Sequence, residues 1–127
     1  MSQTLEDEPP RVLDVIRQAV ELDEQNDAAF ATQILRDLVA EFPRVAIAHG
    51  YLGWILSRGG RHREAIECCR AAVQLAPTSE RVSVLLFRVL WSAGESELAF
   101  DEMRRFVAIA DSEEYARIIQ ELQQMGN

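Results

Sequence analysis

The chain has 127 residues, of which 48% are apolar, and a formal net charge of −8. This length corresponds to one ordinary domain and the apolar fraction is enough for a core, so wholesale disorder is excluded. The acidic balance disfavours non-specific binding to nucleic-acid phosphates.

The first residues, "MSQTLEDEPP", are acidic and contain no apolar run. They therefore do not resemble a signal peptide, and residues 1–9 are expected to be a flexible acidic N-terminus. No uncharged run reaches the roughly 18 residues of a membrane-spanning helix. The two cysteines are adjacent and form no disulfide framework, which favours a reducing compartment and a cytoplasmic location.

Seven helices are predicted in chain order. Pro10 suits the first turn of the first helix, Pro43 and Pro77 follow helix ends, and Asp111 has capping-box spacing to Glu114. Strand-like alternation is absent, so the chain is predicted to be all-α. The expected ranges are 10–24, 27–41, 45–58, 62–75, 79–92, 95–109 and 112–125.

The sequence repeats with a period of 34 residues. Asn26, Gly60 and Gly94 coincide at this spacing, and all three residue types suit turns. Further coincident columns are Ala31, Ala65 and Ala99; Leu22, Leu56 and Leu90; Arg36, Arg70 and Arg104; and Val39, Val73 and Val107. So many columns at one spacing indicate repeated helical hairpins rather than chance.

The residues of the central hairpin resemble the tetratricopeptide repeat. Leu52 and Gly53 occupy the early Leu–Gly positions of its first helix, Ala65 and Ala72 the small positions of its second helix, and Pro77 the closing position. The resemblance covers about residues 12–111 and implies an α-solenoid. It departs from the family in the third unit, where Phe87 and Phe106 occupy positions that usually hold small residues.

We therefore expect a single domain over 10–127, made of three helix–turn–helix repeats at about 12–45, 46–79 and 80–111. A helix at 112–125 is expected to cap the last repeat, because one hairpin cannot cover its own apolar stripe. Its apolar residues recur at helical spacing, and they are Tyr115, Ile118, Ile119 and Leu122.

The resemblance implies a concave groove that binds a peptide or a helix of another protein. Carried over by position, the groove residues are Leu13, Ile16, Val20, Ile47, Gly50, Trp54, Arg58, Arg81, Val84, Arg88 and Trp91. Helical spacing independently puts residues 81, 84, 88 and 91 on one stripe. Trp and Arg are typical of binding hot spots, although both tryptophans could instead belong to the core between helices. Arginines in a groove of an acidic chain indicate a partner segment with apolar and acidic residues.

The reactive residues of the central hairpin have a structural interpretation. Four ligands in paired spacings are typical of structural zinc, but Cys68 and Cys69 are adjacent and the nearest histidine is His62. Cys69 matches core positions of the other repeats and should behave as a small hydrophobe. No phosphate-binding or nucleophile motif is present, so no metal, no cofactor and no enzymatic activity are expected.

The leading functional hypothesis is a cytoplasmic scaffold or chaperone-like adaptor that acts by binding alone. Its length and acidity are similar to those of small bacterial secretion chaperones with three such repeats. The alternative is a self-assembling module, for example a homodimer, in which exposed Leu13, Ile16 and Val20 pack on a second copy. Neither a nucleic acid nor a membrane is expected as a partner.

Overall fold

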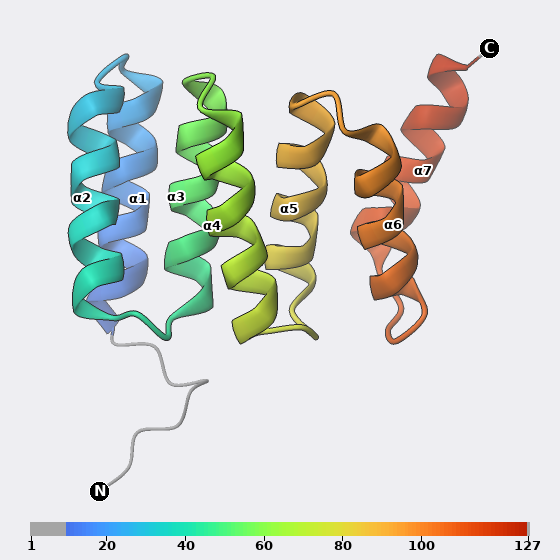
Figure 1. The fold of residues 1–127 in the computed structure, drawn as a ribbon, viewed down its shortest axis with the longest axis horizontal. Coiled ribbons are helices and arrows are strands. Elements are labelled where there is room, and N and C mark those ends of the chain that lie inside the picture. Colours follow the sequence, from blue (N-terminus) through green and yellow to red (C-terminus); the bar gives the residue numbers. More distant parts are fainter. Residues whose placement is uncertain (1–9, 127) are drawn as a thin grey trace, which may run out of the picture.

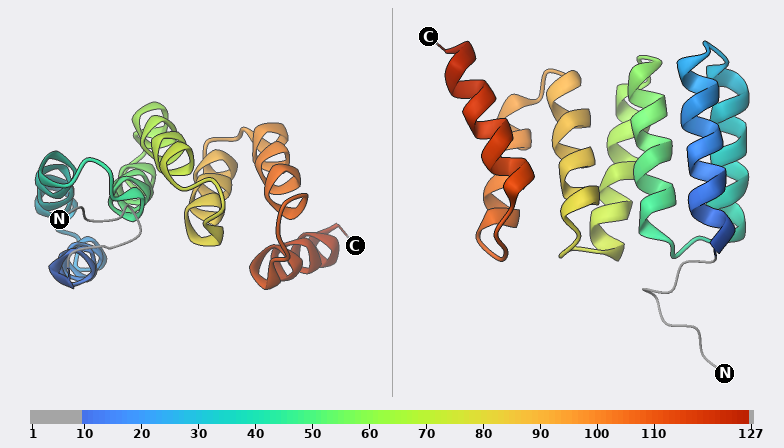
Figure 2. Two further views of the ribbon diagram at one scale, coloured as in Figure 1. Left: turned by 90° about the horizontal axis from the view of Figure 1, so that it is seen from below. Right: turned by 180° about the vertical axis from the view of Figure 1, so that it is seen from behind.

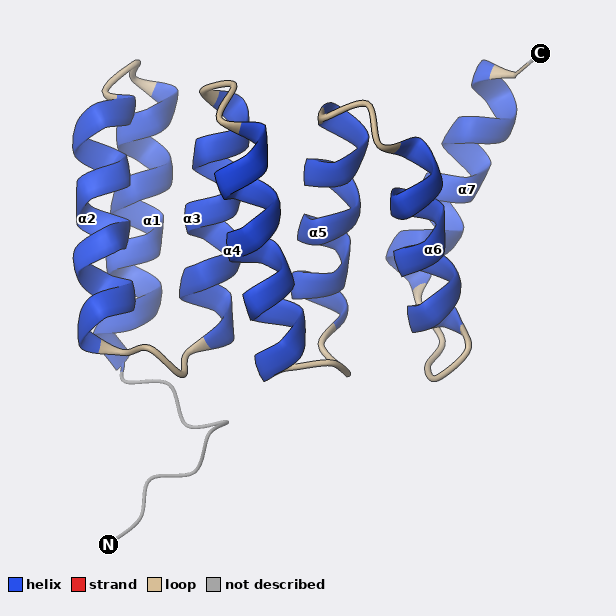
Figure 3. Cartoon of the chain, viewed as in Figure 1, coloured by secondary structure: helices blue, strands red, loops and turns tan. Residues whose placement is uncertain are grey.

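The computed structural model describes residues 10–126, and all regular secondary structure in this range is helical (Figure 3). The predicted acidic N-terminus at 1–9 lies outside the described residues. The prediction of an all-α fold is confirmed. The helices are α1 (Pro10–Glu24), α2 (Ala28–Glu41), α3 (Ala46–Arg58), α4 (His62–Leu75), α5 (Glu80–Ser92), α6 (Ser96–Val107) and α7 (Glu113–Met125).

The observed helix starts differ from the predicted ones by one residue where a capping residue had been counted as helical. Asp27, Ser79 and Ser112 are N-caps, whose side-chain oxygens each accept a hydrogen bond from the backbone N–H three residues later. The predicted capping role of Asp111 is wrong, because Ser112 Oγ accepts the N–H of Tyr115 at 2.9 Å instead. Caps adopt non-helical backbone angles, so they lie just outside the helix.

The three turn residues that coincide at the 34-residue spacing adopt the same backbone conformation in their hairpins. Asn26, Gly60 and Gly94 have φ of 68°, 82° and 81°, the left-handed region that Gly and Asn tolerate best. In each hairpin the N–H that follows this residue donates to the carbonyl of the Leu22, Leu56 or Leu90 column, at 2.8, 2.9 and 2.9 Å. This is the Schellman geometry that ends a helix, and it explains why both the turn residue and the leucine recur every 34 residues.

Successive helices from α1 to α6 pack as antiparallel neighbours, α7 packs against α5, and together they form a row from α1 to α7 (Figure 1). Seen from below, α2, α4 and α6 lie on one side of the row and α1, α3, α5 and α7 on the other (Figure 2). In the same view α1 and α7 project beyond α3 and α5. The face made by α1, α3, α5 and α7 is therefore concave.

Helices α3 and α4 approach each other closely at Gly53, which has no side chain to separate them. A Cβ atom at Gly53 would lie 2.5 Å from Cys69 Sγ and 2.8 Å from the Ala65 carbonyl oxygen. Phe87, 34 residues later, instead fills the space between α5 and α6 with a ring that is edge-to-face with Phe100 at 6.2 Å. The family's small residue is thus replaced here by an aromatic contact.

The last helix is joined to α5 and α6 by rings and by a buried polar network. Tyr115 is fully buried, and its ring packs against Phe87 and Phe106 with centroids 5.8 and 5.9 Å away. Ser83 Oγ lies 2.7 Å from Tyr115 Oη and donates to Glu102 Oε2 at 2.7 Å. Arg105 adds two hydrogen bonds to the Glu102 carboxylate, so that buried charge is paired. The network joins α7 to α5 and α6 at the end of the row.

Candidate protein-binding surface

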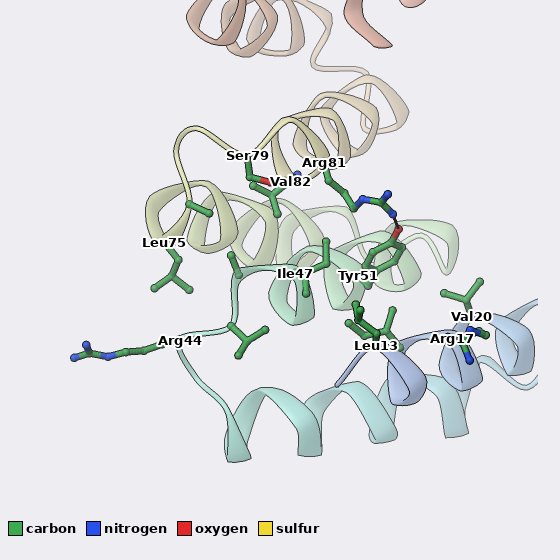
Figure 4. A pocket seen from close by; sticks show the side chains of 14 residues that line it. Leu13, Arg17, Val20, Arg44, Ile47, Tyr51, Leu75, Ser79, Arg81 and Val82 are labelled. Atoms are coloured by element: carbon green, nitrogen blue, oxygen red, sulfur yellow. Dashed lines mark hydrogen bonds between the residues drawn. The ribbon is translucent and has the colours of Figure 1, made fainter. Parts of the chain in front are cut away.

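A hollow of about 710 Å³ opens on the concave face at the end where α1, α3 and α5 begin (Figure 4). We call it the arginine hollow. Its floor is apolar, and three arginines belong to its lining, of which Arg44 extends away from the other lining side chains (Figure 4). The lining residues are Leu13, Ile16, Arg17, Val20, Arg44, Val45, Ala46, Ile47, Tyr51, Leu75, Ala76, Ser79, Arg81 and Val82.

The charge of this hollow is opposite to that of the chain. Among the described residues that line it there are three arginines and neither Asp nor Glu, although acids outnumber basic residues 21 to 13 in the sequence. Arg17 pairs with Asp14 at 3.1 Å on its own helix, and both side chains are exposed. Arg81 Nη1 donates to Tyr51 Oη at 3.0 Å, and that bond holds the guanidinium beside Tyr51 without neutralising its charge (Figure 4).

Two further hollows continue along the concave face. The middle hollow, of about 350 Å³, shares Tyr51 and Arg81 with the arginine hollow and is also lined by Trp54, Glu80, Val84, Leu85, Arg88 and Glu114. The tryptophan hollow, of about 220 Å³, shares Trp54 and Arg88 with the middle one and is also lined by Phe87, Trp91, Ser92, Ile118, Glu121, Leu122 and Met125. Because neighbouring hollows share side chains, the three form one furrow from α1 to α7.

The electrostatics change along the furrow. In the middle hollow Arg88 Nη2 lies 3.2 Å from Glu114 Oε2, so this cation is paired across α5 and α7. The tryptophan hollow is mainly apolar and aromatic. A segment lying in the furrow would meet uncompensated positive charge at the α1 end and apolar surface at the α7 end.

Nine of the eleven predicted groove residues line the furrow, and Gly50 and Arg58 do not. Arg58 instead directs its Nε to Asp23 Oδ2 at 2.6 Å, because the end of α3 lies beside α1. Their role in binding stays a prediction, since no partner is present. Gly50 was also expected in the groove, but a Cβ there would lie 2.9 Å from Leu85 Cδ1, so it faces α5.

The exposure of the predicted residues is uneven. Ile16, Ile47 and Val84 are buried and form the floor of the furrow. The expectation that Ile16 is exposed for self-assembly is therefore wrong, because α3 packs against that side of α1. Leu13 is 53% exposed and stands at the rim.

The two tryptophans combine packing with exposure. Trp91 is 39% exposed, and its ring stacks on Phe87 with centroids 6.0 Å apart and planes 12° apart. Trp54 is half-buried and lines two of the hollows. Each tryptophan therefore packs against neighbouring side chains and also lines the furrow. A role in the core between helices and a place in the groove, the two alternatives left open by the sequence, do not exclude each other.

Several furrow residues were not predicted from the sequence. Tyr51 follows Ile47 by four residues and precedes Trp54 by three, so the stripe through the predicted α3 positions contained it. Arg44 lies in the loop before α3, where helical spacing gives no guide. Ile118, Leu122 and Met125 line the tryptophan hollow from α7, which had been assigned only a capping role.

The central cysteines have a packing role in this structure. Cys69 is fully buried, and burial raises the pKa of its thiol to about 12, with the nearby Cys68 adding to the shift. Burial also raises the pKa of the Cys68 thiol, so both are protonated at neutral pH. Cys69 Sγ lies 3.6 Å from the Gly50 carbonyl oxygen, and both thiols are free. Within residues 10–126 no group of three or more His, Cys, Asp and Glu is arranged to hold a metal ion.

The fold and the furrow define a class: an α-helical repeat protein with a concave face suited to recognition. The family model described as tetratricopeptide repeat matches residues 46–79, which are α3, α4 and the turns around them. The central hairpin is therefore a tetratricopeptide repeat, and the chain has the all-helical fold of a tetratricopeptide-repeat protein. Such domains generally serve protein–protein interaction and are typically non-enzymatic.

Solved structures agree on the fold. A mutant of MamA superposes with a TM-score of 0.64 at 20% identity, covering 85% of this chain and 79% of the MamA chain. MamA AMB-1, in a crystal of space group P212121, gives a TM-score of 0.62 at 20% identity, covering 82% of this chain and 58% of that chain. At this identity the likeness concerns the fold. No curated protein matches the sequence significantly. No helix in the described part of the chain has the length and apolar character needed to cross a membrane.

Proposed function

We propose that this chain is a non-enzymatic scaffold or chaperone-like adaptor that holds a segment of another protein in the concave furrow. The observation that carries the proposal is the continuity of the three hollows, which share Tyr51, Arg81, Trp54 and Arg88. A continuous furrow suits an extended or helical segment better than a compact small molecule. The proposed location is the cytoplasm.

The partner segment would be apolar and acidic. Its acidic end would lie in the arginine hollow, where Arg17 and Arg81 can donate hydrogen bonds to carboxylates. Its apolar end would contact Trp54 and Trp91, the residue type most enriched at binding hot spots. Because one end of the furrow is positively charged and the other is apolar, we also propose this orientation for the bound segment.

We also propose the division into repeats at about 12–45, 46–79 and 80–111, with α7 as the cap. The left-handed turn residues recur at each predicted hairpin, which supports this division. The seat of Tyr115 between Phe87 and Phe106 supports the capping role, because it covers apolar rings that the last repeat would otherwise expose.

The proposal is tested by paired substitutions in the full chain. Leu13→Asp introduces a charge at the rim of the furrow, and Phe30→Asp makes the same kind of change on α2. The two side chains are similarly exposed, at 53% and 55%, so both variants should fold with stability losses on the order of 0.5 kcal/mol. Arg81→Gln removes a furrow charge, and Arg70→Gln, on exposed α4 surface, is its matched control.

The readout is capture from extracts of the native cell, quantified by mass spectrometry and followed by titration of the captured protein. We expect a partner that binds wild type, Phe30→Asp and Arg70→Gln alike and binds Leu13→Asp and Arg81→Gln at least tenfold more weakly. A partner that both members of each pair bind equally well would refute the furrow as its site.

Self-assembly is the alternative function. Phe30 on α2 and Leu98 and Val107 on α6 are exposed apolar residues outside the furrow, which favours a contact between copies. Light scattering across a hundredfold range of concentration tests it. A molar mass that stays at 14.4 kDa removes this alternative.

A further inference from the structure

The arginine hollow has an apolar floor and positive charge that its own lining does not compensate. Ile16, Ile47 and Val82 form part of the floor and are buried, while Arg44 and Arg81 are exposed. Among the described residues, neither Arg44 nor Arg81 makes a salt bridge. An occupant with one apolar side chain next to several carboxylates would complement this surface.

Residues 1–9 of the same chain have this composition. Their sequence, "MSQTLEDEP", places Leu5 directly before Glu6, Asp7 and Glu8 and contains no basic side chain. The segment joins α1 at Pro10, and Leu13 and Arg17, on the next two turns, line the hollow. The last residue of the segment is thus bonded to a helix that lines the surface it complements.

The chain length also permits contact. Five residue steps separate Leu5 from Pro10, which span at most about 17 Å when extended. The helix rises only about 5 to 10 Å between Pro10 and the positions of Leu13 and Arg17. A short tether gives an effective concentration on the order of millimolar, so a weak intramolecular contact would be well populated.

We propose that the segment 1–9 occupies the arginine hollow of its own chain, with Leu5 on the apolar floor and its three acids beside Arg17 and Arg81, which lie on the same side of the hollow (Figure 4). There it competes with the partner segment for the furrow and is autoinhibitory. The autoinhibitory role rests on the proposed function of the furrow, whereas occupancy of the hollow does not. Salt weakens the contact, since the charges around the hollow are exposed.

Methyl NMR of the full-length chain tests occupancy directly, with leucine and valine methyl groups labelled. The test variant is Glu6→Gln/Asp7→Asn/Glu8→Gln, which neutralises the segment. The matched control is Glu21→Gln/Glu67→Gln/Glu97→Gln, which removes the same number of exposed acids from α1, α4 and α6. Both variants change the net charge equally, so an unspecific charge effect would appear in both.

We expect nuclear Overhauser contacts from Leu5 methyls to Leu13 or Val82 methyls in wild type, lost in the test variant and kept in the control. Absence of these contacts in wild type, or equal shifts of the hollow methyls in both variants, would overturn the proposal. Contacts that strengthen with protein concentration would also overturn it, because they would come from a second copy. The furrow can capture a partner whether or not the segment 1–9 occupies the hollow. Failure of this proposal is therefore distinguishable from failure of the proposed binding function.

Discussion

Gly53→Ala tests the close approach of α3 and α4, on which the central repeat depends. The added Cβ would lie 2.5 Å from Cys69 Sγ and 2.8 Å from the Ala65 carbonyl oxygen, both far inside normal contact distance. Since the oxygen belongs to the backbone, the helices themselves must move apart. Such overpacking costs up to about 3 kcal/mol, and the better helix propensity of Ala returns about 1 kcal/mol. We therefore expect a net loss of about 2 kcal/mol in the free energy of unfolding.

Gly59→Ala is the matched control at the end of the same helix. Its φ is −86°, and the nearest atom to its Cβ would be the Leu56 carbonyl oxygen at an ordinary 3.5 Å, so we expect a change within about 0.5 kcal/mol. Urea unfolding followed by circular dichroism measures both variants, and the melting temperature of Gly53→Ala should fall by about 6–10 °C. Equal stability of the two alanine variants would refute the account of helix contact.

Three further predictions follow from the packing of α4 and α7. Tyr115→Phe removes the hydroxyl that lies 2.7 Å from Ser83 Oγ in a buried site and should cost about 1–2 kcal/mol by urea unfolding; a loss below 0.3 kcal/mol would contradict the network. In the folded state the pKa of the Cys69 thiol is raised to about 12, whereas in the unfolded chain the thiol loses its proton near its usual pKa. The unfolded state therefore binds fewer protons than the folded state above about pH 9. The free energy of unfolding should accordingly fall as the pH rises above about 9, by up to about 1.4 kcal/mol per pH unit. Urea midpoints between pH 8 and 10 should show this slope and Cys69→Ala should reduce it, whereas equal slopes would contradict burial of the thiol. Removal of residues 112–127 should expose the rings that α7 covers and cause loss of monomer by light scattering, and an unchanged monomer with unchanged melting would show that α7 is no cap.

The local features of the fold could be predicted from the sequence because they repeat. Asn26, Gly60 and Gly94 share a spacing of 34 and adopt the same left-handed turn. The misassigned cap at Asp111 shows the limit of such local signals. Asp111 and Ser112 are adjacent residues that can both cap a helix, and only the path of the chain into α7 selects Ser112.

The candidate site was predictable where it follows helical spacing and not where it depends on distant contacts. Ile47, Trp54 and Trp91 reach the furrow as their positions in the repeat imply. Arg58 was misplaced because its partner Asp23 is 35 residues away, and an ion pair between helices has no pattern in the sequence. The network of Ser83, Glu102 and Tyr115 was missed for the same reason.

Hydrogen–deuterium exchange of the full chain, with and without a captured partner, tests whether the concave face holds the partner. We expect slower exchange in α1, α3, α5 and α7, strongest at the beginnings of α1, α3 and α5, with α2, α4 and α6 largely unchanged. Protection confined to α2, α4 and α6 would contradict it.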